Sequence, residues 1–162
     1  MPGIGHIGLG LAAKRIAPKA PLGVLLVATE ATDILAGAVA LTGVHDSWSH
    51  SLFTSVILAS GATLLAARRY RDLRTGTIVG LVVLSHWMLD FIAWKDTLPL
   101  LFGGSQQVGL GLYNGAHNMS EIRPGPAVWA MELGLPLAGL AIYLHTRGVF
   151  SKTHMWLQGS RP

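Results

Sequence analysis

The sequence predicts an all-α membrane protein, a polytopic bundle of helices that crosses the bilayer several times. Four apolar stretches are each about 20 residues long, the length that a helix needs to span the hydrocarbon core. The composition agrees, because 51% of the 162 residues are hydrophobic and only 12% are charged, too few charges for an ordinary soluble domain of this size. We expect a single membrane-embedded domain over residues 1–162, with four full transmembrane helices at 21–43, 49–67, 76–95 and 125–146.

The first apolar stretch, residues 4–17, is too short to cross the bilayer, so we expect a short or half-inserted N-terminal helix there. Pro18 and Pro21 separate it from the first full span, because proline interrupts helical hydrogen bonding. The sequence starts without the basic region or cleavage site of a signal peptide, so the first helix should remain in the mature protein. Residues 96–124 are rich in glycine and polar amides and are expected to form an outer loop, as a lid or a re-entrant segment.

Basic residues gather in the short connections and predict the orientation of the chain. Four arginines and a single acid, Asp72, lie in the 68–75 connection, and such an excess of positive charge is typical of cytoplasmic loops. The basic residues of 14–19 and 147–152 fall on the same side, which predicts an outside N-terminus and an inside C-terminus. The same rule accounts for the net charge of +4, so we expect no nucleic-acid partner.

Ionisable side chains occur inside the apolar segments, where they are costly unless they pair, line a cavity or bind an ion. His86 and Asp90 lie four residues apart and share one face of a predicted helix. Glu30 and Asp33 lie one turn apart in another helix, where two ionised carboxylates repel unless a proton or a cation neutralises them. The other candidates at the middle-to-outer level are His6, His45, His50 and Glu132.

These residues predict a site for one or two divalent ions in the outer half of the bundle. Because the chain contains no cysteine, the ligands would be nitrogen and oxygen atoms, which suit zinc, manganese or iron(II), with zinc as the first expectation. In the structural alternative, His86 and Asp90 form only a hydrogen bond between two helices. His45 and His50 could likewise be solvated residues at the membrane interface.

Four short motifs occur in order along the chain. They are Gly5-His6, Glu30-Ala31-Thr32-Asp33, His45 to His50-Ser51, and Ser85-His86 to Asp90, followed by Pro99-Leu100-Leu101. In this order they resemble the YdjM-like family of bacterial inner-membrane proteins, which are described as membrane-bound metal-dependent hydrolases. The chain departs from the family at two points: the usual Pro-Asp-x-Asp-His motif lacks its closing histidine here, and the usual His-Arg-Gly is His45-Asp46-Ser47.

The family is distantly similar in ligand pattern to the zinc-dependent phospholipase C and single-strand nuclease superfamily. A His-x-x-x-Glu pair closes the ligand set of that superfamily, and His117 and Glu121 of the outer loop would supply it here. The resemblance implies that the metal ligands are His6, Asp33, His45, His50, His86 and Asp90.

The resulting expectation is a metal-dependent hydrolase in the bacterial inner membrane. A bound ion would activate water, and Glu30 or Glu132 could move the proton. A site opening at the outer leaflet suggests lipids or lipid-linked phosphoesters as substrates. One alternative is a cation-binding or transport protein, although the nearly apolar stretches 57–67 and 76–84 indicate a one-sided site. The other is an accessory or structural subunit of a membrane complex, held by membrane-protein partners or in a homo-oligomer.

Overall fold

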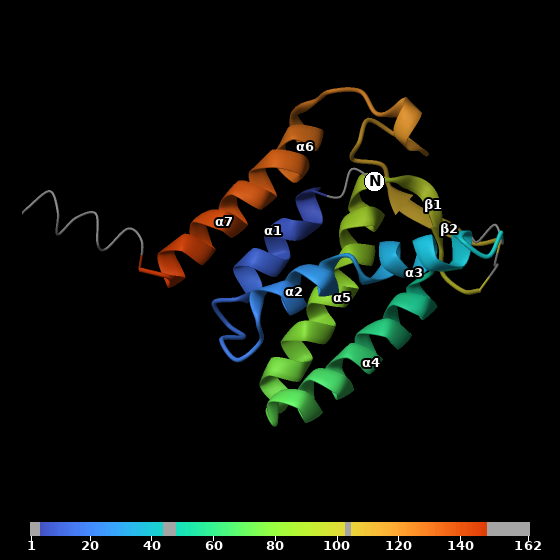
Figure 1. The fold of residues 1–162 in the computed structure, drawn as a ribbon. Coiled ribbons are helices and arrows are strands. Elements are labelled where there is room, and N and C mark those ends of the chain that lie inside the picture. The colour runs from blue at the N-terminus through green and yellow to red at the C-terminus, as the bar shows by residue number, and fades with distance from the viewer. Residues whose placement is uncertain (1–3, 44–47, 103–104, 149–162) are drawn as a thin grey trace, which may run out of the picture.

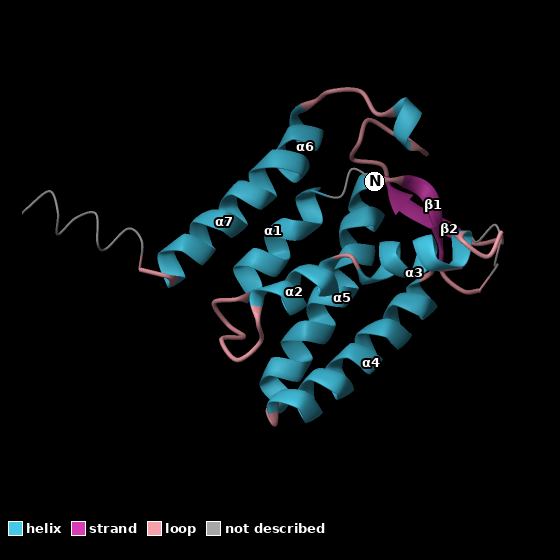
Figure 2. Ribbon diagram, in the orientation of Figure 1, coloured by secondary structure: helices cyan, strands magenta, loops and turns pink. Residues whose placement is uncertain are grey.

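The computed structural model describes residues 4–43, 48–102 and 105–148, and this part of the chain is mostly helical (Figure 1). The elements in chain order are α1 (Ile4–Ala13), α2 (Leu22–Thr29), α3 (Ala31–Ala40), α4 (Leu52–Tyr70), α5 (Leu73–Ala93), β1 (Lys95–Pro99), β2 (Gln107–Leu110), the 3-10 turn η1 (Met119–Glu121), α6 (Pro126–Trp129), the π-helical turn η2 (Ala130–Gly134) and α7 (Leu135–Thr146). Figure 2 shows α1 to α4 around α5, α7 beside α1, and a two-stranded sheet near the end of α5.

Helix α5 is the central element, because α1, α2, α3, α4 and both strands pack against it. It begins after Asp72, whose Oδ2 accepts a hydrogen bond from the Thr75 N–H at 3.2 Å, and so caps the helix. Arg71 precedes it with a φ of 49°, a left-handed conformation that ends α4 and reverses the chain. The buried face of α5 carries His86 and Asp90.

Helix α1 is short and lies among α2, α5 and α7 (Figure 1). Its approach to α7 depends on glycine. A Cβ atom on Gly8 would lie 2.4 Å from the carbonyl oxygen of Leu135, and one on Gly139 would lie 2.1 Å from the carbonyl oxygen of Gly8. Small residues permit this kind of backbone contact between membrane helices. The 10-residue α1 falls within the predicted stretch 4–17 and is largely covered by its neighbours.

The span predicted at 21–43 is not one straight helix, because α2 and α3 meet at 59°. Glu30 lies at the junction with φ −103° and ψ 7°, and its N–H donates to the Val27 carbonyl at 3.2 Å in a tighter turn than that of an α-helix. The bend frees the Thr29 carbonyl oxygen, which accepts a hydrogen bond from His86. The break therefore supplies a backbone acceptor to the interior, as broken membrane helices do when they line a polar site.

Within the described residues, length and composition identify two helices that could cross a membrane, α5 and the continuous helix Pro126–Thr146. The bent pair α2 and α3 would make a third if it acts as one span. Helix α4 has 19 residues, but polar residues such as Ser60, Thr63 and Arg68 lower its hydropathy, and it does not join this group. The structure thus supports two or three spans, where the sequence predicts four.

The connection predicted as an outer loop contains a small antiparallel sheet, so the fold is not entirely α-helical. Strand β1 pairs with β2, with Leu98 opposite Val108 and Pro99 opposite Gln107. Gly109 permits the close approach of the two backbones, because a Cβ atom there would lie 2.2 Å from the Trp94 carbonyl oxygen. The alternating hydrophobicity of so short a hairpin is weak, which explains why the sequence alone did not indicate it.

Two apolar clusters flank a polar layer along α5. One cluster joins α1, α2, α4 and the first half of α5, up to Val83. The other surrounds Tyr113 and includes Ala93 at the end of α5, with Val128 and Met131. His86 and Asp90 lie between them in the sequence of α5. The candidate site is therefore a polar layer enclosed between two hydrophobic cores.

Candidate metal centre

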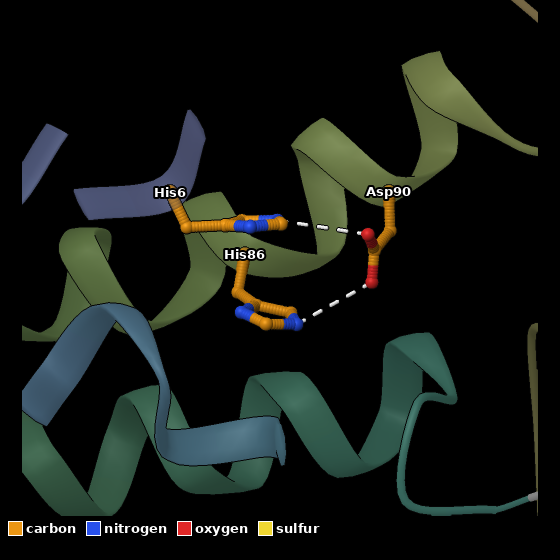
Figure 3. A group of neighbouring side chains, drawn as sticks. All are labelled: His6, His86 and Asp90. Atoms are coloured by element: carbon orange, nitrogen blue, oxygen red, sulfur yellow. Dashed lines mark ion pairs between the residues drawn. The ribbon is translucent and has the colours of Figure 1, made fainter. Parts of the chain in front are cut away.

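Three buried side chains from two helices form the inner part of the site. Figure 3 shows His6 of α1 facing His86 and Asp90 of α5. The Nε2 atom of His6 lies 3.6 Å from Asp90 Oδ1, and the Nε2 atom of His86 lies 3.4 Å from Asp90 Oδ2. The two imidazole rings stack with centroids 4.1 Å apart. The relative exposures of His6, His86 and Asp90 are 7%, 1% and 8%, so this part of the site is shielded from solvent.

Asp33 and His50 complete a second group around the same histidine. Asp33 Oδ1 lies 3.6 Å from His86 Nε2 and 3.0 Å from His50 Nε2. These two side chains are only partly covered, with 35% of the Asp33 side chain and 29% of the His50 side chain exposed. Within the described residues, two groups of three side chains could each hold a metal ion. One is His6, His86 and Asp90, and the other is Asp33, His50 and His86. The site thus has a buried wall and an open side.

A backbone hydrogen bond fixes the tautomer of His86. Its Nδ1 lies 2.6 Å from the Thr29 carbonyl oxygen, and a carbonyl can only accept, so Nδ1 carries the hydrogen. The lone pair of Nε2 then faces the carboxylates of Asp33 and Asp90. Three electron-rich groups at this distance require a positive charge between them, either a proton on Nε2 or a cation.

The unpartnered nitrogen atoms of His6 favour a cation. Within the described residues, both Nδ1 and Nε2 of His6 are buried without a hydrogen-bond partner. Buried polar atoms without partners are rare in proteins and commonly mark a bound ion or water. Donor atoms of His and Asp on a tetrahedral zinc ion lie about 3.3–3.4 Å apart, from bond lengths near 2.0–2.1 Å. The separations of 3.4–3.6 Å at His6, His86 and both aspartates are close to that value, so the residues fit a divalent ion.

Glu132 lies beside this cluster and is held by Tyr113. A small cavity is lined by His6, Asp90, Tyr113 and Glu132, among others. The Tyr113 hydroxyl donates a hydrogen bond to Glu132 Oε1, whereas Oε2 is buried without a partner in the described part of the chain. Burial and the adjacent Glu132 carboxylate raise the pKa of the Tyr113 hydroxyl well above its ordinary value, so it stays a hydrogen-bond donor.

The sequence did not indicate some residues of the site. The Trp94 indole N–H donates to Asp90 Oδ1 at 3.2 Å, and the four-residue spacing from Asp90 was a signal that could have indicated it. Tyr113 lies in an irregular segment, and the Thr29 carbonyl belongs to the backbone, so no sequence pattern pointed to either. The turn η2, which carries Glu132, is a π-helical insertion, a feature frequent at functional sites.

Three predicted residues lie apart from the cluster in the described structure. Glu30 is half-buried at the junction of α2 and α3, where its Oε1 accepts a hydrogen bond from the Thr29 hydroxyl at 3.3 Å. His117 and Glu121 form an exposed pair in and before η1, with Nδ1 and Oε2 3.2 Å apart. Hydrogen bonds from the His117 backbone N–H and ring lower the pKa of Glu121, so this pair is internally satisfied. His45 lies outside the described residues.

Comparison of the chain with models of protein families, with curated proteins and with solved structures found no match. The resemblance to the YdjM-like family therefore stays a prediction.

Proposed function

We propose that this protein is a membrane-embedded, metal-dependent hydrolase whose metal is held by His6, Asp33, His86 and Asp90, with His50 at the open side. The observation that carries the proposal is the convergence of nitrogen and oxygen atoms from α1, α3, α5 and the turn before α4 on His86, beside the buried ring of His6, whose nitrogens have no hydrogen-bond partner within the described residues. Zinc is the first candidate, with manganese and iron(II) as the others.

The uneven burial of the donors favours a catalytic site over a purely structural one. Structural zinc sites are closed by four protein ligands and are commonly built from cysteine, whereas catalytic sites keep a position open. The chain has no cysteine, and Asp33 and His50 are partly exposed while His6, His86 and Asp90 are buried. A substrate would approach on the side of Asp33 and His50.

The residues of the chain have separate tasks in this proposal. A divalent ion, when bound, supplies Lewis-acid activation of water and of a phosphoryl or carbonyl oxygen. Thr29 and Trp94 orient His86 and Asp90 through the hydrogen bonds described above. Glu132 shares a cavity with His6 and Asp90, and its Oε2 has no hydrogen-bond partner in the described residues. In the proposal this oxygen accepts the proton of the attacking water and later returns it. Tyr113 positions Glu132.

The substrate class we propose is a lipid or lipid-linked phosphoester. In this arrangement the chain lies in the bacterial inner membrane with four spans, and α4 is the span of lowest hydropathy. The metal site opens toward the outer leaflet, since His86 and Asp90 lie in the second half of α5 and the arginine-rich turn precedes that helix. The apolar helices around the site would admit an amphiphile more readily than a soluble metabolite.

The first experiment measures bound transition metal in the full chain purified in detergent, next to His86→Ala, Asp90→Asn and the control His117→Ala. We expect about one ion per chain in the wild type and the control. The candidate ligand atoms lie around His86 Nε2, because His86 Nδ1 is already used by the Thr29 carbonyl. Both site variants should hold at least about tenfold less. His117 is a matched control, since its exposed pair with Glu121 lies apart from the cluster.

Turnover separates the hydrolase from a protein that merely holds a metal. The Glu132→Gln variant should keep its metal but hydrolyse a phosphoester lipid about 10²–10⁴-fold more slowly than the wild type. Absence of metal in the wild type after loading with zinc, manganese and iron(II) would contradict the proposal. It would indicate instead that a protonated His86 bridges the two aspartates, as in an accessory subunit whose polar layer holds its helices together.

A further inference from the structure

An open apolar groove lies between α2 and α4, with α5 as its floor. Its volume is about 320 Å³. Val24 and Val27 line it from α2, Leu65 from α4 and Val83 from α5. Val27 and Leu65 are 60% and 69% exposed, so no described segment of the chain covers the groove. Such a surface gains free energy when an apolar partner removes it from water.

One end of the groove carries a positive charge. Arg69 and Tyr70 line this end, and the Arg69 guanidinium carbon lies 5.8 Å from the centre of the Tyr70 ring. Within the described residues, the ion pairs to Asp and Glu leave Arg69 without an acidic partner. The acid of the adjacent turn, Asp72, already pairs with Lys19 at 3.6 Å and caps α5. The groove therefore combines an apolar trough with an uncompensated guanidinium.

We propose that this groove binds one anionic phospholipid, with an acyl chain along Val27, Leu65 and Val83 and the phosphate at Arg69. A guanidinium matches a phosphate group through two parallel hydrogen bonds. Basic pockets between membrane helices commonly select acidic headgroups in this way. The neighbouring arginines of the same turn, Arg68 and Arg71, add to the positive potential.

This lipid is distinct from the proposed substrate. The headgroup of the lipid would lie at the turn before α5. Arg74 stands at the start of α5 next to this turn, and His86 of the polar layer follows it by 12 residues, about 18 Å at the rise of an α-helix. A phosphate at Arg69 is thus too far from the polar layer to be hydrolysed there. The lipid would instead hold α2 and α4 together across α5 and stabilise the fold.

The test is native mass spectrometry of the full chain in detergent, titrated with phosphatidylglycerol or with phosphatidylcholine of the same acyl chains. The wild type should bind one phosphatidylglycerol about tenfold more tightly than phosphatidylcholine. Arg69→Gln should remove this preference, whereas Arg68→Gln, which changes the same charge beside the groove, should keep most of it. Ala62→Phe, which fills the groove from α4, should weaken binding of both lipids at least tenfold. Metal content should be unchanged in all three variants, which separates this test from that of the hydrolase.

Four results would overturn the proposal. Equal binding of the two lipids by the wild type, or a preference that survives in Arg69→Gln, would mean that the groove only contacts bulk lipid. Displacement of the lipid by millimolar inorganic phosphate would reduce the site to an anion site at Arg69. If the wild type formed dimers without bound lipid, and Ala62→Phe dissociated them, the groove would instead bind a second copy of the chain.

Discussion

At the scale of single residues, the polar layer is held in place by groups that are not themselves candidate ligands. The Thr29 carbonyl fixes one face of His86, and the Trp94 indole fixes one oxygen of Asp90. Such outer partners orient the ligand atoms and commonly influence metal affinity as strongly as a change of geometry does. The cluster is therefore preorganised by the protein, and an ion would need to reorganise little of it.

Tyr113 supports Glu132 rather than a candidate ligand, so loss of its hydroxyl should affect stability and not metal content. Tyr113→Phe deletes the hydroxyl that donates to Glu132 and leaves the carboxylate in a buried cavity with one donor fewer. The loss of a partner to a buried polar group costs about 1–3 kcal/mol of unfolding free energy. We expect a lower thermal unfolding midpoint at neutral pH, with the metal content unchanged because Tyr113 is not among the candidate ligands.

The control for this change is Tyr143→Phe in the middle of α7, where the residue is half-buried. This control should unfold close to the wild-type midpoint in the same detergent. Equal midpoints for the two variants would show that the hydrogen bond between Tyr113 and Glu132 does not contribute to stability.

The sequence names the candidate residues of the site, but it predicts their relative placement only where a periodic signal links them. His86 and Asp90 stand four apart in an apolar helix, and the structure places them on one face. The proximity of His6 and His50 to them depends on how helices far apart in the sequence pack, which one sequence does not encode in any local pattern. The sequence predicts Glu30 on one helical face with Asp33, but the Glu30 carboxylate accepts a hydrogen bond from the Thr29 hydroxyl at the junction of α2 and α3 and is not part of either candidate group.

At the scale of elements, the packing of α1 against α7 controls where His6 lies. The two helices meet at Gly8 and Gly139, whose backbones touch because neither has a side chain. His6 lies two residues before Gly8 on the same short helix. Any change in the spacing of the two helices should therefore move His6 relative to Asp90.

Gly139→Ala should separate these helices. The new Cβ atom would lie 2.1 Å from the Gly8 carbonyl oxygen and 2.7 Å from its Cα, and backbone atoms cannot rotate away as a side chain can. Overpacking of this kind costs about 1–3 kcal/mol. We expect a lower unfolding midpoint together with weaker metal binding, measured by competition with a chelator.

Gly37→Ala provides the matched comparison within α3, because a Cβ atom there would meet nothing within 4 Å. Alanine favours the helix over glycine by up to about 1 kcal/mol, so this variant should be as stable as the wild type or more so. If Gly139→Ala matched Gly37→Ala in both measurements, the contact between α1 and α7 would not position the site.

The sequence did not predict the break between α2 and α3, and the reason is physical. Hydropathy measures whether a segment prefers lipid, and it has no term for the direction of the backbone. Residues 22–43 contain no proline, and a polar stretch such as Thr29-Glu30-Ala31-Thr32-Asp33 is compatible with a continuous helix as well as with a bend. At the bend the Thr29 carbonyl has its donor in His86 of α5, a partner that lies far away in the sequence.

At the scale of the whole molecule, two ends of α5 have opposite character. The turn before it is rich in arginine, and Lys19 of the α1–α2 connection joins it through an ion pair with Asp72. The other end meets the small sheet and the polar layer. If the chain lies in a membrane, the arginine-rich end should face the cytoplasm.

Cysteine labelling can test this orientation, since the chain contains no cysteine of its own. Leu73→Cys places a thiol at the arginine-rich turn, where Leu73 is 71% exposed, and Ser105→Cys places one at an exposed position between the two strands. A membrane-impermeant maleimide added to intact bacterial spheroplasts should label Ser105→Cys. It should label Leu73→Cys only after the cells are opened.

Neither substitution removes a charged residue, so the distribution of basic residues that sets the orientation is preserved. The reverse labelling pattern would invert the topology and place the metal site on the cytoplasmic side. Labelling of both positions in intact spheroplasts would contradict a membrane-spanning arrangement of α5.

The contact between α1 and α7 also affects the order in which the molecule can be assembled. The ribosome makes α1 before α7, and Gly139, which touches Gly8, is made more than a hundred residues later. Until then one glycine-lined face of α1 lacks its partner. Contacts so distant in the chain form late in folding, so His6 would complete the polar layer only after most helices are inserted. A metal ion that needs His6 as a ligand would therefore bind only the finished bundle.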